Sequence, residues 1–490
     1  MMAQWNNSRE VRERIVIEGT LRLESPAHLG NGDLAGLTDI SLLRDPLAGR
    51  ALLTGSSIAG ALRNYLRERE LGYGRAEASD GNTLAEQLFG FIDEREDELE
   101  KSWQSWLIVE DALGSAPNVE LRDGVAIDAR TRTAKRGTLY DMELLQAGTE
   151  FELRFELWIS ATNSTDLVFA LATALHGLET GEIGLGKRKA RGFGECRVTN
   201  WRARRYKMDD IQDVTAWLKN DWGNTEKKAR IEETLNICLD DADKRKKMTL
   251  NATFKLDSPL LIRSGAGAAD EPDTAHFKSK RGGKDSAVLP GTSAAGAMRA
   301  RALRIAKTLQ LADADTLIER MFGKGDTRDR APNRETAKPK GSRVVVRERE
   351  IKDAPEIELV QSRVKIDRFT GGAFPQALFQ EQPLFGDAKT RVQIEIELRA
   401  ANDGANFARE VGLLLLVLKD LWTGDLPLGG EASVGRGRLK GESATLKCDG
   451  HEWVLTDKDG ALEISSTFKD TNEAQEILEG YVEALREVNA

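Results

Sequence analysis

The stretch Leu53-Thr54-Gly55-Ser56-Ser57-Ile58-Ala59-Gly60-Ala61-Leu62-Arg63 decides the fold, because the chain carries it twice. It returns 236 residues later as Leu289-Pro290-Gly291-Thr292-Ser293-Ala294-Ala295-Gly296-Ala297-Met298-Arg299. In both places a Gly and a hydroxyl-bearing pair precede an apolar pattern of helical period, which is typical of a helix start. The sequence places the N-cap of the first helix at Ser56 or Ser57.

Three further landmarks repeat in the same order at nearly the same spacing. The number of residues between matching landmarks changes little from pair to pair, which indicates two copies of one domain. Two copies are too few for a solenoid. The pairs are Leu88-Phe89-Gly90 with Met321-Phe322-Gly323, Val125 to Thr131 with Val364 to Thr370, and Gly186 to Gly194 with Gly429 to Gly437.

Each copy has the same order of patterns: an alternating strand, the Gly-Ser/Thr-Ser helix, a basic hairpin-like segment after an Ile-Asp pair, a second strand, a second helix and a final strand. This order predicts an α+β fold of two tandem ferredoxin-like (RRM-like) domains with inserted hairpins. The predicted boundaries are 1–208 for the first domain, 209–247 for a helical linker, 248–445 for the second domain and 446–490 for an acidic extension. A last helix is expected to start at Asp470 or Thr471.

The composition of the 490 residues excludes several classes of protein. No apolar run is long enough for a membrane span, and the N-terminus lacks the apolar core of a secretion signal. Three isolated cysteines exclude a disulfide framework and fit a reducing, cytoplasmic location. Four scattered histidines leave little material for zinc chemistry.

The net charge of −9 argues against a nucleic-acid binder when it is read alone. Residues 441–490, however, hold 4 Lys/Arg and 12 Asp/Glu and so account for most of it. Basic clusters stand out elsewhere: 181–210 holds 9 Lys/Arg against 4 Asp/Glu, and 321–350 holds 9 against 5. Local basic patches of this kind are what phosphate binding requires.

The two helix starts are candidate phosphate sites, since free backbone N–H groups and the helix dipole favour an anion. An ordinary N-cap explains each start equally well, and both interpretations stay open. The candidate contacts are Ser56, Ser57 and Arg63 in the first copy and Thr292, Ser293 and Arg299 in the second.

The glycine-rich loops follow a helix and precede a strand, which is the reverse of the dinucleotide-binding order. Their basic residues are candidate contacts to a polyanion backbone, with a solvated basic turn as the alternative. These candidates are Lys187, Arg188, Lys189 and Arg191 in the first copy and Arg436 in the second, which is the weaker site.

Acidic residues lie in the loop before each Gly-Ser/Thr-Ser helix. An acid there could hold a divalent cation or orient an attacking group, although Asp is also common in turns. The candidates are Asp33, Asp39 and Asp45 in the first copy and Asp270 and Asp273 in the second.

Taken together, these motifs resemble the RAMP superfamily of CRISPR-associated proteins. Thr38 to Pro46 ahead of Gly55-Ser56-Ser57, and the Ile-Asp-Arg-Phe-Thr-Gly-Gly core beginning at Ile366, resemble the backbone subunit of type III effector complexes. The resemblance covers roughly 10–208 and 248–445. Two copies in one chain look like the fused backbone subunits of type III-D-like complexes.

The resemblance implies a subunit that lines guide crRNA and displays target single-stranded RNA within an antiviral ribonucleoprotein complex, alongside other type III effector subunits. A thumb hairpin from each copy would displace a base pair at about every sixth nucleotide. The family's catalytic, metal-holding acid falls by position on Asp39 and, in the second copy, on Asp273. It would act with a divalent cation, Mg²⁺ or Mn²⁺, as an endoribonuclease. The thumbs are expected within 129–148 and 368–388, with Leu139, Tyr140, Phe374 and Phe379 as wedges.

Departures from the family pattern keep two alternatives open. The second copy lacks an Arg-Asp-Pro element, and Ala59 and Ala295 stand where the family often has Lys. The chain could therefore be a non-catalytic RNA scaffold. It could also be a metal-independent guide-processing endonuclease, which needs a base such as His28 or His276.

Overall fold

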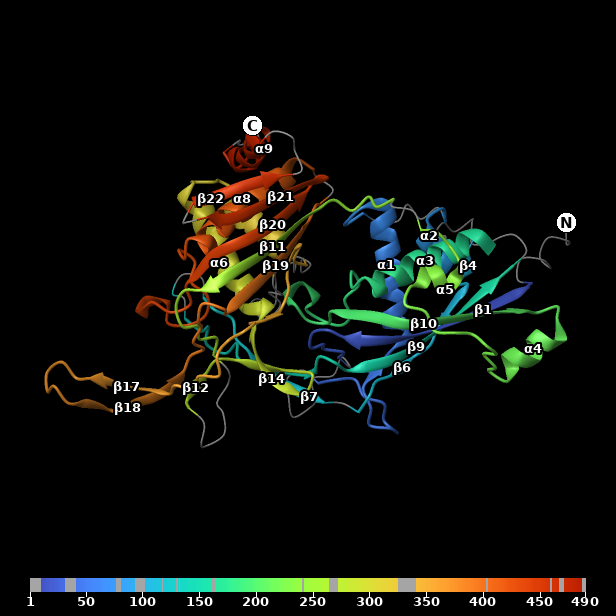
Figure 1. Cartoon of the computed structure of the whole chain (residues 1–490), viewed down its shortest axis with the longest axis horizontal. Helices are drawn as coiled ribbons and strands as arrows, with labels where there is room; N and C mark the ends of the chain where they lie inside the picture. Colours follow the sequence, from blue (N-terminus) through green and yellow to red (C-terminus); the bar gives the residue numbers. More distant parts are fainter. Residues whose placement is uncertain are drawn as a thin grey trace, which may run out of the picture. The chain divides into compact units, whose positions relative to one another are not determined.

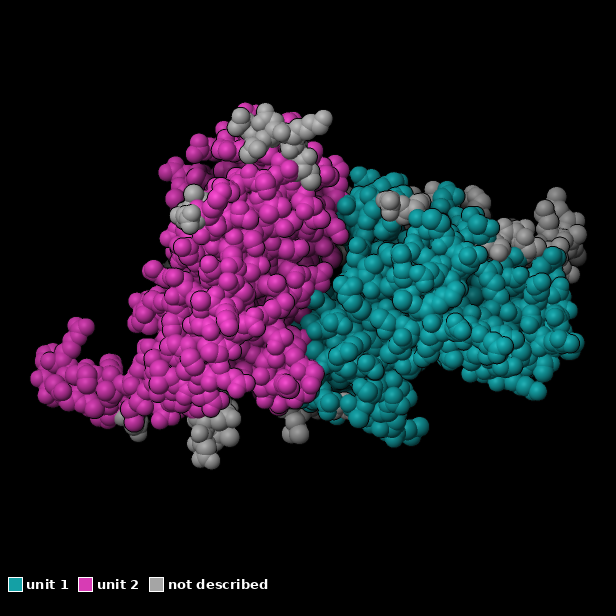
Figure 2. Space-filling view, viewed as in Figure 1, with its two compact units in different colours: residues 1–120, 143–189, 193–245 teal, residues 121–142, 190–192, 246–490 magenta. Residues whose placement is uncertain are grey.

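The computed structural model describes two compact units of the chain (Figures 1 and 2). Unit 1 comprises 1–120, 143–189 and 193–245, and unit 2 comprises 121–142, 190–192 and 246–490. Two segments of the first repeat thus belong to unit 2, a difference from the predicted boundary. The residues described are 10–30, 41–75, 81–92, 102–116, 118–128, 131, 133–160, 164–239, 242–263, 272–324, 341–401, 404–458, 461–466 and 471–486.

Unit 1 is built on an antiparallel sheet of strand order β10-β1-β9-β5. Alternate residues of β1, such as Ile15, Ile17 and Leu21, are buried, as the alternating pattern predicted. The helices α1 and α3 contact each other, and α3 also contacts β9 and β10. These elements are β1 (Glu13–Leu23), α1 (Gly55–Leu71), β5 (Leu107–Val109), β9 (Glu150–Ile159), α3 (Ser164–Glu179) and β10 (Cys196–Lys207).

A bulge interrupts the β1–β10 register beside Gly19. A Cβ atom on Gly19 would lie 2.6 Å from the ring of Trp201, which is fully buried. Glycine is needed here because the indole takes the space of a side chain.

The segment predicted as a linker packs on unit 1. Its helices are α4 (Ile211–Leu218) and α5 (Ile231–Leu235). Ile231 and Leu235 are buried in the unit 1 core, and the amide of Ile231 donates to Glu179 Oε2 at 2.6 Å.

Unit 2 has a wider sheet, of strand order β15-β19-β11-β20-β21-β22. The helices α6 and α8 contact each other, α6 contacts β15, and α8 contacts β20, so the core lies between helices and sheet. These elements are β11 (Lys247–Leu256), α6 (Gly291–Thr308), α7 (Ala314–Phe322), β15 (Val344–Val346), β19 (Arg391–Arg399), α8 (Gly404–Trp422) and β20 (Leu439–Cys448). The α+β class is confirmed in both units.

The acidic extension continues this sheet instead of standing apart from it. β21 (His451–Lys458) and β22 (Ala461–Ser466) add to the edge at β20, and α9 (Thr471–Glu483) begins where the sequence predicted. Ala474 and Leu485 are buried against the domain, and the indole of Trp453 donates to the Ala474 carbonyl at 3.0 Å. The extension is therefore a folded part of unit 2.

Two hairpins occupy equivalent places in the copies. The first pairs β7 (Val119–Gly124) with β8 (Tyr140–Leu145), and the second pairs β17 (Gln361–Ile366) with β18 (Ala373–Gln382). Figure 1 shows the second hairpin projecting from the sheet of unit 2. The remaining elements are β2 (Leu52–Leu53), α2 (Leu84–Phe89), β3 (Gly90–Phe91), β4 (Trp103–Gln104), β6 (Ala112–Leu113), β12 (Thr274–Ala275), β13 (Lys278–Arg281), β14 (Lys284–Leu289), β16 (Arg349–Glu350) and the 3₁₀ turns Lys189–Arg191 and Ala432–Val434.

Within the described ranges, no helix has the length and apolar character needed to cross a membrane.

Candidate nucleic-acid interface

The start of α1 is already capped by the protein itself. Thr54, and not Ser56 or Ser57, is the N-cap: its Oγ1 accepts from the Ser57 amide at 3.3 Å. The Gly55 amide donates to Asp111 Oδ1 at 2.7 Å. A carboxylate therefore occupies part of the predicted phosphate site, while Ser56 and Ser57 remain exposed. Arg63, on the next turn, is half-buried.

The start of α6 is more enclosed. Its cap residue is Pro290, which makes no side-chain cap hydrogen bond, and Thr292 and Ser293 are half-buried. Gly291 lies against the carbonyl oxygens of Arg191 and Val346 within unit 2. Arg299 donates to the Gly323 carbonyl at 2.9 Å, and so it closes the end of α7. This geometry offers little room for a phosphate beside Gly291.

The first glycine-rich loop divides its basic residues between two roles. Lys187 and Lys189 are exposed and suit contacts to a polyanion. Arg188 is half-buried, with a φ of 59°. Arg191 is half-buried too, and its Nη2 donates to the Phe322 carbonyl at 3.0 Å. The outer part of this loop is therefore its candidate binding face.

The second glycine-rich loop differs, because Arg436 is buried in an ionic cluster. Its Nη1 lies 3.0 Å from Glu381 Oε2 and 2.6 Å from Glu431 Oε2, and its Nη2 donates to Gln361 Oε1 at 2.6 Å. Arg363 Nε lies 3.0 Å from Glu381 Oε2. The predicted phosphate contact by Arg436 has no support in this geometry, since the guanidinium faces two carboxylates inside the protein.

This cluster, which we call the hairpin anchor (Arg363, Glu381, Glu431 and Arg436), joins both strands of the second hairpin to the glycine-rich loop. Glu381 is fully buried. Burial opposes its ionisation, but a hydrogen bond from Glu431 and the charges of Arg363 and Arg436 lower the pKa of Glu381. Burial and the hydrogen bond with Glu381 raise the pKa of Glu431. The pair thus favours one carboxylate and one carboxylic acid.

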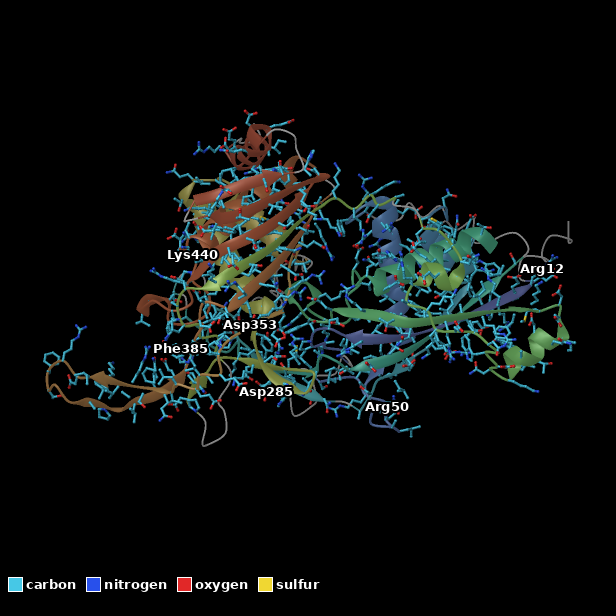
Figure 3. All side chains as sticks on the ribbon, viewed as in Figure 1. Arg12, Arg50, Asp285, Asp353, Phe385 and Lys440 are labelled. Atoms are coloured by element: carbon cyan, nitrogen blue, oxygen red, sulfur yellow. The ribbon has the colours of Figure 1, made fainter. Side chains whose placement is uncertain are left out.

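The second hairpin exposes an unusual number of apolar side chains. Phe369, at its turn, is 99% exposed, and Phe374 and Phe379 on β18 are also exposed. Lys365 Nζ lies 4.7 Å from the Phe374 ring centroid. In Figure 3 the side chains of this hairpin extend along both of its edges. Exposed aromatic rings beside cations are the side chains on which single-stranded bases stack.

The two hairpins start earlier than predicted. The Ile-Asp pair, expected to precede each hairpin, lies within it: Ile366 ends β17, and Asp367 accepts from the Phe369 amide at 2.9 Å in the turn. The predicted range 368–388 therefore misses all of β17. Phe374 and Phe379 lie on the hairpin, and their role as wedges stays a prediction. The prediction gave no role to Phe369 at the turn.

The first hairpin carries aliphatic rather than aromatic exposed side chains. Leu139 is 69% exposed, and Leu121 and Ile127 are exposed as well. Tyr140 is half-buried at the start of β8. At the root of this hairpin, Arg122 is buried and pairs with Glu348, which is itself buried and also pairs with Arg281 at 2.5 Å.

Of the candidate acids, Asp273 and Asp45 can be examined, while Asp33, Asp39 and Asp270 lie outside the described residues. Asp273 is exposed, and its Oδ2 accepts from the Gln380 amide of β18 at 2.7 Å. Asp45 accepts from the amides of Leu47 and Ala48, at 3.1 and 2.5 Å, as an ordinary turn residue does. Asp273 thus brings an exposed carboxylate to the root of the second hairpin.

Of the two acids predicted to hold a divalent cation, Asp273 lies among the described residues and Asp39 does not. Within the described part of the chain, no three His, Cys, Asp or Glu side chains gather into a metal-binding group. Asp273 could supply one carboxylate, and a magnesium ion bound in this way takes its other ligands from water and substrate phosphate.

Both candidate bases for metal-independent chemistry are buried. His28 Nδ1 lies 3.0 Å from the Glu143 carbonyl of β8, and burial lowers the pKa of its imidazole. His276 Nδ1 accepts from the Ile262 amide at 3.3 Å, and burial lowers its pKa to about 4. Each neutral ring stands inside the protein beside a hairpin root, which suits a structural role.

A comparison with known families supports the internal repeat. A model of the RAMP superfamily matches residues 20–197 and 253–440, one region in each copy and well over half of the chain. No curated protein matches the sequence. The chain therefore belongs to the RAMP superfamily, a membership that implies a CRISPR-associated, RNA-binding protein.

Proposed function

We propose that this protein is a guide-RNA-binding backbone subunit of a type III CRISPR effector complex, with two ferredoxin-like backbone domains fused in one chain. The observation that carries the proposal is the second hairpin, which exposes Phe369, Phe374 and Phe379 together with Lys365. A globular protein gains nothing from three exposed rings on one hairpin unless a partner covers them. Bases of a guide–target duplex are such a partner.

The hairpin would act as a wedge. Base–aromatic stacking contributes about 1–3 kcal/mol per base and tolerates any sequence. This suits a subunit whose specificity comes from base pairing in the guide and not from its own side chains. The hairpin anchor would hold the wedge at a fixed angle to the second glycine-rich loop. In this proposal, the backbone next to that loop faces RNA.

For target cleavage we propose Asp273 and, in the first copy, Asp39. The ribose 2′-hydroxyl loses its proton and attacks the adjacent phosphorus, while the bond to the 5′-oxygen breaks and that oxygen gains a proton. A bound divalent cation supplies charge neutralisation at the phosphate. Asp273 would orient the hydroxyl or hold the cation, since the Gln380 amide binds only one of its carboxylate oxygens.

A non-catalytic scaffold is the second candidate. It is favoured by the divergent acidic loop of the second copy, which lacks the Arg-Asp-Pro element of the first. It predicts RNA binding without cleavage in a complex whose other nucleases are inactive.

The test is cleavage of a guide-matched RNA by the assembled complex with Mg²⁺ or Mn²⁺. We expect two cuts about six nucleotides apart, one lost in Asp39→Asn and the other in Asp273→Asn. The matched control is Asp285→Asn, an exposed acid that pairs with Lys280 at 2.8 Å. If the double variant binds RNA and still yields both products, the catalytic assignment is wrong. The scaffold is then supported if those products disappear once the other nucleases of the complex are inactivated.

A further inference from the structure

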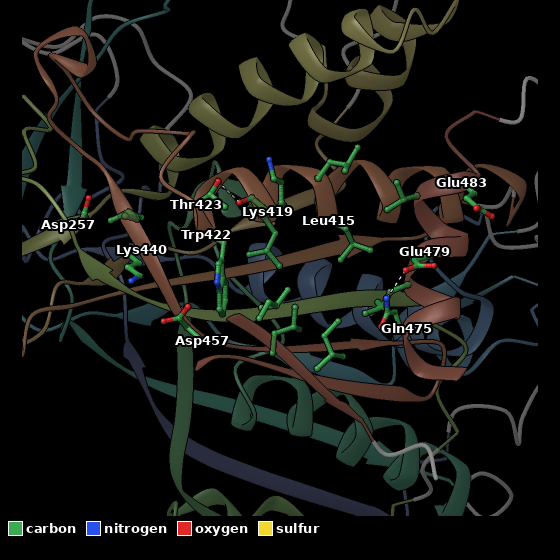
Figure 4. A pocket seen from close by; sticks show the side chains of 18 of the residues that line it. Asp257, Leu415, Lys419, Trp422, Thr423, Lys440, Asp457, Gln475, Glu479 and Glu483 are labelled. Carbon is green, nitrogen blue, oxygen red and sulfur yellow. Dashed lines mark hydrogen bonds between the residues drawn. The ribbon is translucent and has the colours of Figure 1, made fainter. Parts of the chain in front are cut away.

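An open apolar groove lies where the acidic extension meets unit 2. It has a volume of about 910 Å³ and runs between α8, α9 and the strands β20, β21 and β22 (Figure 4). We call it the tail groove. It is distant in sequence from the hairpins, and the RNA-binding proposal makes no use of it.

The walls of the tail groove are mostly aliphatic. α8 contributes Leu415, Leu416 and Trp422, and α9 contributes Leu478 and Val482. The strands add Leu455, Leu462 and Ile464, of which Leu462 is 50% exposed. Apolar surface left in water costs about 25 cal/mol per Å², so an unfilled groove of this kind favours a partner that covers it.

The length of α8 beyond its contact with α9 sets the size of the occupant that the groove can take. α8 and α9 meet backbone to backbone where Gly412 faces the Tyr481 carbonyl. Ala474 and Leu485 are buried on the same helix pair. From Gly412 to Trp422, α8 continues for ten residues, or about 15 Å at 1.5 Å per residue. That length is suited to two or three turns of a third helix.

The charge around the groove selects the partner. α9 has four glutamates and no lysine or arginine over its 13 residues. Glu479 and Glu483 of this helix line the groove, together with Asp257 and Asp457. Three cations also line it: Lys419, Lys440 and Arg486. Lys419 lies 3.3 Å from Asp420 and 3.7 Å from Asp425, so its charge is offset by its own domain. Four acids thus stand against Lys440 and Arg486, and this excess of negative charge favours a partner with basic flanks.

We propose that the tail groove binds an amphipathic helix of a partner protein, with an apolar stripe of two to three turns flanked by lysine or arginine. The apolar stripe would contact Leu416, Leu462 and Leu478, and the basic flank would face Glu479 and Glu483. This is the helix-in-groove mode, in which residues spaced i, i+3, i+4 and i+7 enter the groove. The proposal does not depend on the assignment of the RNA site.

The test uses the full chain, freed of RNA, and two fluorescein-labelled 18-residue helical peptides. Both place Leu at i, i+3, i+4 and i+7; one has Lys and the other Glu at its remaining positions. We expect the Leu/Lys peptide to bind by fluorescence anisotropy and the Leu/Glu peptide to bind at least tenfold more weakly. Leu462→Gln should weaken Leu/Lys binding at least tenfold, whereas Leu218→Gln, on exposed α4, should leave it unchanged.

A second variant separates groove binding from general attraction to an acidic protein. Glu479→Lys combined with Glu483→Lys should reverse the preference between the two peptides while the thermal melt of the chain stays in place. Equal binding of Leu/Lys by the parent and by Leu462→Gln would overturn the proposal. A second outcome would also overturn it: neither peptide binds, but the apolar dye 1-anilinonaphthalene-8-sulfonate binds the parent and not Leu462→Gln. The groove would then be a small-molecule pocket.

Discussion

The first and second hairpins hold equivalent positions in the two copies, yet they differ at the tip and at the root. The second presents three exposed phenylalanines and is held by four charged residues of the hairpin anchor. The first presents leucine and isoleucine and is held through Arg122 and Glu348. After duplication the fold constrained where each hairpin leaves the domain, but not which side chains contact RNA or which ion pairs fix the root.

The largest expected effect is a loss of folding stability on mutation of the charged residues at the hairpin roots. Glu381→Ala removes the fully buried carboxylate that Arg363 and Arg436 share and leaves both guanidinium groups with Glu431 alone. Breaking a buried pair in this way costs up to about 3–5 kcal/mol. Arg122→Ala should cost less, because Glu348 keeps its pairing with Arg281. Urea unfolding, with hydrogen exchange of the hairpin amides, measures both losses.

The control for this comparison is Glu463→Ala, which removes an exposed pair with Lys458 and should change stability by less than about 1 kcal/mol. Equal losses for Glu381→Ala and Arg122→Ala would mean that the two roots are energetically alike.

The second effect is a pH dependence at the buried histidines. The pKa of His276 falls to about 4 on folding, so the unfolded chain takes up a proton first as the pH drops. Stability is thus fully present above about pH 6.5 and is lost as the pH falls towards 4, by up to about 3 kcal/mol. His276→Asn should flatten this slope in urea titrations between pH 7 and 4.5.

His28 beside the first hairpin shifts in the same direction, because burial lowers its pKa too. An unchanged slope in His276→Asn combined with a flattened one in His28→Asn would assign the acid sensitivity to the first copy instead.

The third effect separates the two tips. Phe369→Ala should weaken binding of guide-matched RNA by about 1–3 kcal/mol, or roughly fivefold to more than a hundredfold. If base stacking drives the contact, Leu139→Ala should weaken RNA binding less than threefold, since a leucine offers no aromatic face. Filter binding at a fixed salt concentration measures both, with Ile211→Ala on exposed α4 as the control. Similar losses at both tips would show that burial of apolar surface, and not stacking, drives the contact.

Sequence reasoning located elements that are set by local patterns. α1 and α6 begin at the repeated Gly-Ser/Thr-Ser stretch, although the cap of α1 is Thr54 and α6 has no side-chain cap. α9 begins at Thr471 as predicted, and the core strands follow from alternation. The second hairpin was placed too late, because most residues of β17 are exposed and do not alternate as those of a half-buried strand do. The alternation rule applies to strands with one buried face.

The root contacts were missed for a different reason. Arg122 and Glu348 lie 226 residues apart, and Glu381 and Arg436 come from different elements. Nothing local in the chain marks such pairs, and Arg436 was read as a phosphate contact because an arginine in a glycine-rich loop has the same local signature. Asp111 at the start of α1 was missed in the same way.

The smallest effect tests the two helix starts, where the copies differ as the hairpins do. Thr54→Ala removes the side chain that caps the Ser57 amide and should cost about 1 kcal/mol. Thr292→Ala should cost little, because α6 has no side-chain cap at Pro290 and packs its first residue against backbone carbonyls. Thermal melts of the full chain measure the difference. If Thr54→Ala leaves the melting temperature unchanged, the Asp111 carboxylate alone is sufficient to stabilise the backbone amides at the start of α1. The two copies would then differ there by one carboxylate and not by their cap residues.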